Sequence, residues 1–113
     1  MRLHLLIAAL LIFPLSAFAA DSCTVIHGRA RLYSGDSQLR IWHVGTHHDF
    51  EPDETSWDMV MGWLNEGTTK IPADNVMLFG NFTVCPTEPF RKGAVQHAKI
   101  ISVKNRHYVR LDD

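Results

Sequence analysis

Histidine and carboxylate side chains gather in one short segment of the chain. His47 and His48 are followed closely by Asp49 and Glu51, whereas His43 belongs to a preceding predicted strand that turns it toward the core. Imidazole nitrogens and carboxylate oxygens are ligands that suit Zn²⁺, Cu²⁺ and Ni²⁺. The segment therefore indicates a candidate metal site formed by His47, His48, Asp49 and Glu51. The alternative interpretation is a solvated polar loop.

The sequence contains none of the common catalytic motifs. There is no G-x-S-x-G nucleophile elbow, no phosphate-binding loop and no H-E-x-x-H motif. The only cysteines, Cys23 and Cys85, are far from C-x-x-C spacing, so a reactive or metal-binding thiol is not indicated. We therefore expect a protein without catalysis and with no identifiable cofactor, while a hydrolase of unspecified type remains a third class.

The N-terminal segment has the pattern of a bacterial signal peptide. Arg2 precedes a short apolar stretch, and Ala17 and Ala19 lie at the two small-residue positions before a cleavage site. The apolar stretch is shorter than the ~20 residues that span a bilayer, so we expect membrane contact only before cleavage. The sequence predicts a signal peptide over residues 1–19 and a single exported domain over residues 20–113, in the periplasm or the medium.

Cys23 and Cys85 are predicted to form a disulfide. An exported chain of this size meets oxidants and has limited apolar surface to bury. The bond would close a loop across 62 positions and contribute roughly 4 kcal/mol by the chain-entropy estimate. That is a large part of the ~5–15 kcal/mol of a typical domain.

Residues 24–33 and 38–44 predict a β-hairpin. Both are rich in β-branched and aromatic residues, and a polar segment containing Gly35 separates them. Gly35 suits the first central position of a type II′ turn, where a positive φ is required. The resulting register places Leu32 opposite Leu39 on the core face.

The other face of this hairpin carries Arg29, Arg31, Arg40 and Trp42, with Arg31 directly across from Arg40. Facing like charges are unfavourable by a few tenths to ~1 kcal/mol, so an anion is expected nearby. An internal anion would come from the acidic segment 49–54. An external one would be a phosphate, sulfate or uronate group of a ligand, with Trp42 as an apolar or cation–π wall.

A helix and a polar loop are predicted after the hairpin. Residues 55–66 have apolar side chains at three- and four-residue intervals, with Thr55 as N-cap and Gly67 past the end. The preceding residues 47–54 lack apolar periodicity and predict a loop or an irregular edge.

The C-terminal half predicts further strands. Residues 76–84 have a β composition in which Gly80 indicates a bulge or a close backbone approach. Residues 94–103 and 107–111 bracket Lys104-Asn105-Arg106 and predict a second hairpin. The fold class is thus mainly β: a small antiparallel barrel or sandwich with one short helix and one disulfide. An OB-like barrel is one topology with the helix among the strands.

Charge is segregated along the chain. Residues 41–69 contain six acidic residues and no Lys or Arg, whereas residues 89–111 contain six basic residues and no acid. The two segments either face each other within the fold or dock an oppositely charged partner. The predicted mature chain has a formal charge of −2, with ten basic and twelve acidic residues, so no nucleic-acid partner is expected.

Three segments resemble small secreted proteobacterial proteins of unknown function. They are GRARLYSG (28–35), RIWHVGT (40–46) and FGNFTVCP (79–86). The resemblance implies a bacterial, exported setting and brings no functional residues with it.

These observations together predict a small exported, non-enzymatic binding or interaction module with an exported or periplasmic partner or an anionic ligand. The alternative is a periplasmic metal-binding protein that uses the His47-His48 acidic segment.

Overall fold

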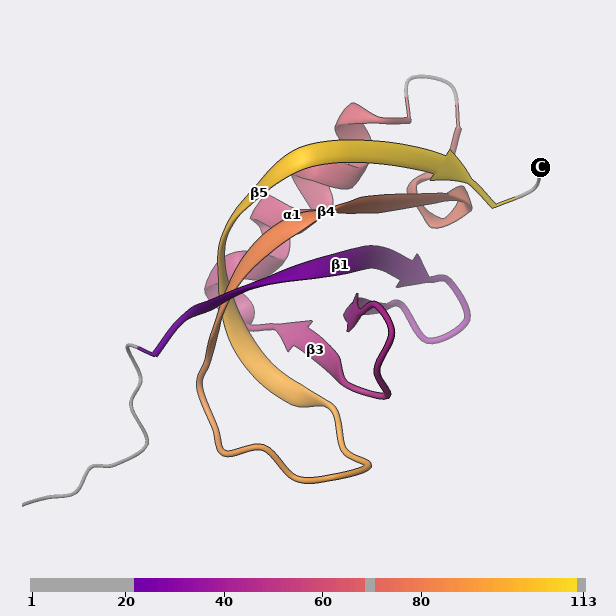
Figure 1. Cartoon of the computed structure of the whole chain (residues 1–113). Coiled ribbons are helices and arrows are strands. Elements are labelled where there is room, and N and C mark those ends of the chain that lie inside the picture. The colour runs from indigo at the N-terminus through magenta and orange to yellow at the C-terminus, as the bar shows by residue number, and fades with distance from the viewer. Residues whose placement is uncertain (1–21, 69–70, 112–113) are drawn as a thin grey trace, which may run out of the picture.

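The computed structural model describes residues 22–68 and 71–111; the predicted signal peptide, residues 1–19, lies outside them. In this described part of the chain, five strands, one α-helix and one 3₁₀ helix follow one another (Figure 1). In order they are β1 (Thr24–Tyr33), β2 (Gln38–His43), β3 (Asp49–Pro52), α1 (Glu54–Glu66), η2 (Ala73–Asn75), β4 (Val76–Pro86) and β5 (Gln96–Arg110). Within these described residues, no helix has the length and apolar character that crossing a membrane requires.

The strands close into a barrel in the order β1-β2-β3-β5-β4. All neighbouring strands are antiparallel except β3 and β5, which are parallel. Because α1 lies between β3 and β4 in the chain, this is the arrangement of an OB-like barrel. The predicted fold class is confirmed, including the short helix near residues 55–66 and the Cys23–Cys85 disulfide.

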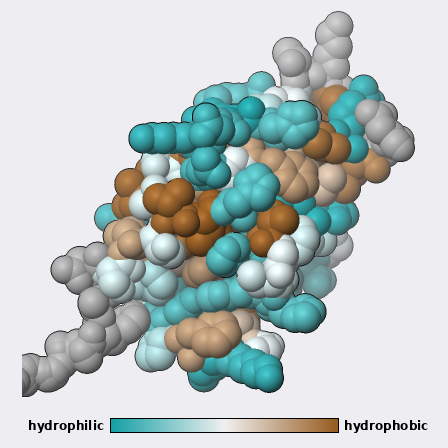
Figure 2. All heavy atoms as spheres, in the orientation of Figure 1, coloured by the Kyte–Doolittle hydropathy of each residue, from teal (hydrophilic) through white to brown (hydrophobic). Residues whose placement is uncertain are grey.

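The interior of the barrel is filled by alternate residues of the strands and by one side of α1. Hydrophobic residues also gather toward the middle of the molecule in the space-filling view, with hydrophilic residues around them (Figure 2). From α1, the buried residues Val60, Trp63 and Leu64 join the strand core. The strand residues of this core are Ile26, Ala30, Leu39, Ile41, Phe50, Val76, Leu78, Phe82, Val84, Ala98, Ile100 and Val103.

The β1–β2 hairpin has the predicted register. Leu32 pairs with Leu39, Arg31 pairs with Arg40, and the core and outer faces are those expected from the sequence. The predicted type II′ turn is wrong, because the positive φ belongs to Ser37 (53°) and not to Gly35. A four-residue loop with a left-handed last residue gives the same strand pairing, so the register survives a different turn.

The helix begins one residue earlier than predicted. Asp53 is the N-cap, and its side chain accepts a hydrogen bond from the Ser56 N–H, so Thr55 lies inside the first turn. Burial raises the pKa of Asp53, but hydrogen bonds from Thr55 and Ser56 outweigh it and hold the pKa below its ordinary value. Ser56 is itself buried and accepts a hydrogen bond from the Ile100 N–H (2.8 Å), which ties α1 to β5.

Two expectations about the strands are wrong. Residues 49–52, predicted as part of a loop or an irregular edge, form the strand β3, which pairs on one side with β2 and on the other with β5. The predicted hairpin at residues 94–111 is instead the single strand β5, since Lys104-Asn105-Arg106 forms a bulge and not a turn. Asn105 takes the left-handed conformation there (φ 57°), and pairing with β4 continues on both sides.

The bulge predicted at Gly80 is confirmed by a shift of the β4–β5 register next to it. A Cβ atom on Gly80 would come within 2.7 Å of Val103 Cγ2 and 2.9 Å of the Lys104 carbonyl oxygen. The two strands therefore approach each other too closely there for any residue with a side chain.

Candidate functional site

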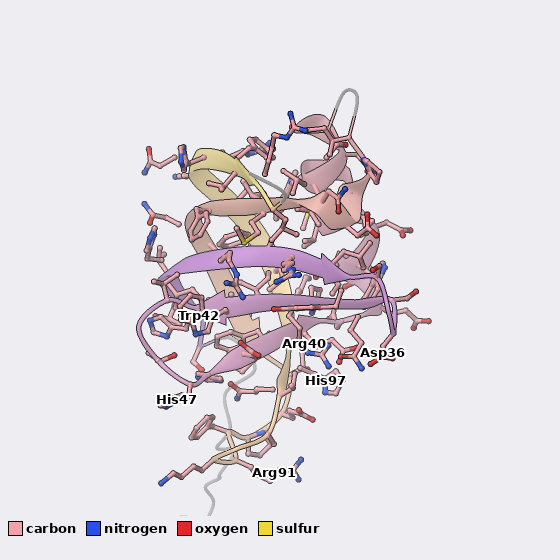
Figure 3. All side chains as sticks on the ribbon, turned by 90° about the vertical axis from the view of Figure 1, so that its right-hand side faces the viewer. Asp36, Arg40, Trp42, His47, Arg91 and His97 are labelled. Atoms are coloured by element: carbon pink, nitrogen blue, oxygen red, sulfur yellow. A yellow bond between two sulfur atoms is a disulfide. The ribbon has the colours of Figure 1, made fainter. Side chains whose placement is uncertain are left out.

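The outer face of β1, β2 and β3 carries two transverse rows of side chains. The strand register aligns Arg29, Trp42 and Asp49 in one row. The next row contains Arg31, Arg40 and Glu51. Glu51 is placed beside Arg40 because it lies two residues after Asp49 along β3. Figure 3 views this face, with Arg40 and His97 on one side and Trp42 and His47 on the other. The four residues proposed from the sequence to bind an anion are therefore on one surface.

Arg40 has an internal counter-ion. Its Nη1 lies 3.2 Å from Glu51 Oε1, and its Nη2 donates to the Gln38 side-chain oxygen at 2.9 Å. Only 16% of the Arg40 side chain and 30% of the Glu51 side chain are exposed. Of the two anions considered for the arginine pair, the internal one is therefore present at Arg40.

His97 extends this group of charged residues toward the β4–β5 loop. Its Nε2 lies 3.6 Å from Glu51, and its Nδ1 lies 3.0 Å from Glu88. The backbone N–H and then the side chain of His97 hydrogen-bond to Glu88 and hold the pKa of that carboxyl below its ordinary value. Arg40, Glu51 and Glu88 on this side of the barrel thus all have partners within the protein.

Arg29 and Arg31 are held by aromatic rings and not by carboxylates. The Arg29 guanidinium carbon lies 4.8 Å from the Trp42 ring centroid, and that of Arg31 lies 4.3 Å from the Tyr33 ring centroid. Arg29 Nη2 also donates to the Tyr33 hydroxyl at 3.1 Å. Neither arginine forms an ion pair within the described residues, and their buried Nε atoms lack hydrogen-bond partners there.

A pocket of about 590 Å³ lies beside Arg29, and we call it the Trp42 pocket. The β2–β3 loop forms one wall, where Gly45 has a positive φ of 89°. The Trp42 indole N–H donates to the Thr46 carbonyl oxygen at 2.7 Å and so fixes the ring against this loop. The pocket is lined by Arg29, Trp42, Gly45, Thr46, His47 and Asp49.

The structure does not bring the predicted metal ligands together. His47 and Asp49 line the Trp42 pocket, Glu51 pairs with Arg40, and His48 Nε2 bonds to Gln96 Oε1 at 2.9 Å. Among residues 22–68 and 71–111, no group of three or more His, Cys, Asp or Glu side chains could hold a metal ion. Asp49 and Glu51 share the outer face of β3, but Glu51 is engaged by Arg40, and His48 turns instead to Gln96, so the four side chains do not converge on one point.

Sequence reasoning missed the contacts made by the β4–β5 loop, residues 87–95. The His48 ring packs between Phe50 and Phe90, with ring centroids 4.2 and 4.6 Å away. Gln96 is buried, and its Nε2 donates to the Glu88 carbonyl oxygen, which leaves its Oε1 to accept from His48 Nε2–H. No local sequence signal could have paired a loop with residues about forty positions earlier.

These contacts bound a second pocket, of about 420 Å³. It is lined by His43, Thr46, His47, His48, Phe90, Lys92 and Gly93. His43, which the sequence placed on the core face, is half-buried at this edge of the barrel.

The acidic and basic segments of the chain meet within the fold. Arg106 Nη1 donates to Glu66 Oε1 at 2.5 Å, and the charge of Lys99 helps to lower the pKa of Asp53. Part of the charge segregation is therefore satisfied between elements of the same barrel.

In comparisons with known proteins, no family model, no curated protein and no solved structure matches this chain.

Proposed function

We propose that this protein is a small exported, non-enzymatic binding module that holds an anionic ligand on the outer face of β1 and β2. The observation that carries the proposal is the pair Arg29 and Arg31. Both are fixed in place, and neither has a carboxylate partner within the described residues. Arg40, which we first grouped with them, is assigned to the structural ion pair with Glu51.

The geometry favours binding because the arginines are preorganised. Each guanidinium has five N–H donors in a plane, and ring stacking restricts the side chain before a ligand arrives. A ligand therefore loses less side-chain entropy than it would on freely moving arginines. Arg29 donates one hydrogen bond to the Tyr33 hydroxyl, and Arg31 makes no side-chain hydrogen bond to another described residue. Several guanidinium N–H groups therefore remain to bind an oxyanion.

The exported setting is part of the same proposal. The Cys23–Cys85 disulfide is consistent with an oxidising compartment. The signal-peptide pattern of residues 1–19 and the resemblance to secreted proteobacterial proteins point in the same direction. The periplasm or the medium of a bacterium is thus the expected location of the ligand.

The test is a titration of the ¹⁵N-labelled protein with sodium sulfate at constant ionic strength, followed by amide chemical shifts. We expect saturable shifts around residues 29–31 and 42–46. The R29Q/R31Q variant should lose saturation, whereas the matched control R40Q should keep it because Arg40 is engaged by Glu51. Non-saturating shifts in wild type, or equal saturation in R29Q/R31Q, would exclude this anion site.

A further inference from the structure

We infer that the Trp42 pocket is built for a carboxylated sugar, whose carboxylate pairs with Arg29, whose ring lies on Trp42 and whose hydroxyls donate to Asp49. This inference rests on the proposed function and names the ligand class of the same site. It is carried by what lines the pocket besides the arginine.

Trp42 offers the pocket an apolar surface and no hydrogen-bond donor. Its N–H is occupied by the Thr46 carbonyl oxygen, and the Arg29 guanidinium lies over the ring. The part of the indole available to a ligand is therefore the ring carbon that Arg29 does not cover. An aromatic ring has an apolar face with negative π density. The C–H side of a pyranose ring complements such a surface, whereas a bare phosphate or sulfate gains nothing from it.

Asp49 gives the pocket a second requirement. Within the described residues its side chain has no ion pair and no hydrogen bond. An ionised carboxylate accepts hydrogen bonds and donates none. It therefore weakens, without abolishing, the binding of a simple anion at Arg29, and it attracts a ligand that presents O–H donors. A cation on one side and a free acceptor on the other select a ligand that carries both an acid and hydroxyls.

The strand register places the acid and the base on opposite sides of Trp42. Asp49 pairs with Trp42 on one side, and Arg29 pairs with Trp42 on the other. The Arg29 guanidinium lies over the Trp42 ring, with its carbon 4.8 Å from the ring centroid. A ligand ring therefore packs against the indole surface that Arg29 leaves open, with its carboxylate toward Arg29 and its hydroxyls toward Asp49.

The experiment compares four probes with the purified protein by the same amide titration. Glucuronate has the ring, the acid and the hydroxyls. Cyclohexanecarboxylate lacks the hydroxyls and glucose lacks the acid. γ-Aminobutyrate lacks the ring and carries an ammonium group in place of the hydroxyls. We expect wild type to bind glucuronate about tenfold more tightly than each of the other three, a difference of about 1.4 kcal/mol that two additional hydrogen bonds can supply.

Two variants separate the contributions of the acid and the base. D49N should weaken glucuronate about fivefold and bind cyclohexanecarboxylate more tightly than wild type does, because the repulsion is gone. D49S checks that this reversal does not depend on the new amide. R29Q should weaken both acids and leave glucose unchanged. The amide spectrum of each variant shows whether the barrel is folded.

The outcomes distinguish the sugar assignment from the anion-binding function on which it rests. Equal affinity of wild type for glucuronate and cyclohexanecarboxylate, or an unchanged preference in D49N and D49S, would overturn the sugar assignment while sulfate binding left the anion site standing. Tightest binding of γ-aminobutyrate would also overturn it and assign a zwitterion to the pocket. Absence of saturable binding for all probes and for sulfate would refute both.

Discussion

Reversing the charge of Arg40 tests whether the ion pair with Glu51 stabilises the barrel. The two groups are 3.2 Å apart, and the Arg40 side chain is 16% exposed, so we place the pair at the upper end of the 0.2–1 kcal/mol range of exposed pairs. R40Q should therefore lose about 1 kcal/mol. R40E loses this attraction and adds a similar repulsion from Glu51, offset by up to ~0.5 kcal/mol from the facing Arg31.

These contributions predict a loss of about 1.5 to 2 kcal/mol for R40E. With an m-value of about 1 kcal/mol/M in urea for a domain of this size, the unfolding midpoint should fall by about 1.5–2 M for R40E and about 1 M for R40Q. The difference should shrink in 1 M NaCl, where the Debye length is only about 3 Å. The charge exchange R40E/E51R should recover most of the loss.

Three results would refute this reasoning. Equal midpoints for R40E and R40Q at low salt would show that Glu51 exerts no field at position 40. A midpoint of R40E above that of wild type would show that repulsion between Arg31 and Arg40 dominates the pair with Glu51. Failure of the charge exchange would show that hydrogen bonds, and not charge, hold Arg40 in place.

Other predictions concern the disulfide, the histidines and one carboxyl group. C23S and C85S should each lower stability by about the same ~2–5 kcal/mol, and titration of the unfolded, unreduced protein should find no free thiol, whereas two thiols per chain would contradict the bond. Zn²⁺ should raise the melting temperature of wild type no more than that of the H47A/H48A variant; a larger rise in wild type would revive the metal hypothesis. The depressed pKa of Glu88 contributes stability above its ordinary value of 4.5 that is lost as pH falls below 4.5 through the folded pKa. Urea midpoints of E88Q should therefore fall less steeply than those of wild type in this range, and parallel curves would contradict the assignment.

The parts of the fold that could be predicted are those fixed by local pattern or by elimination. The β1–β2 register followed from alternating side chains and a short connection, and it was correct although Gly35 does not have the predicted φ. The disulfide followed from the presence of only two cysteines. The helix was placed to within a residue because its apolar spacing is clear.

The parts that failed depend on partners distant in sequence. β3 has four residues and owes its conformation to pairing with β2 and β5, which no local periodicity reveals. Lys104-Asn105-Arg106 has the composition of a turn, but continuous pairing with β4 keeps it within one strand. Local preference is overridden when both sides of a segment are held by the same neighbour.

The candidate site was predicted where it depends on the β1–β2 register and missed where it depends on β3. Arg29, Arg31 and Trp42 share a face because the hairpin register was correct, and the acidic segment was named as the source of an internal anion, which Glu51 provides at Arg40. Asp49 was assigned to a metal site and lies instead in the Trp42 pocket. Its neighbourhood depends on β3, which the sequence did not reveal.

The position of the disulfide has a consequence for how the chain reaches its folded state. Cys23 and Cys85 adjoin the antiparallel pair Thr24–Val84, so the bond fixes β1 against β4 in a single alignment. A slip of one residue would turn every inward side chain of β1 to the solvent. β1 and β4 are about fifty residues apart in sequence, and such non-local pairings are slow to form. Formation of the disulfide therefore locks the correct β1–β4 register after this slow pairing. The chain then retains that register through later partial unfolding.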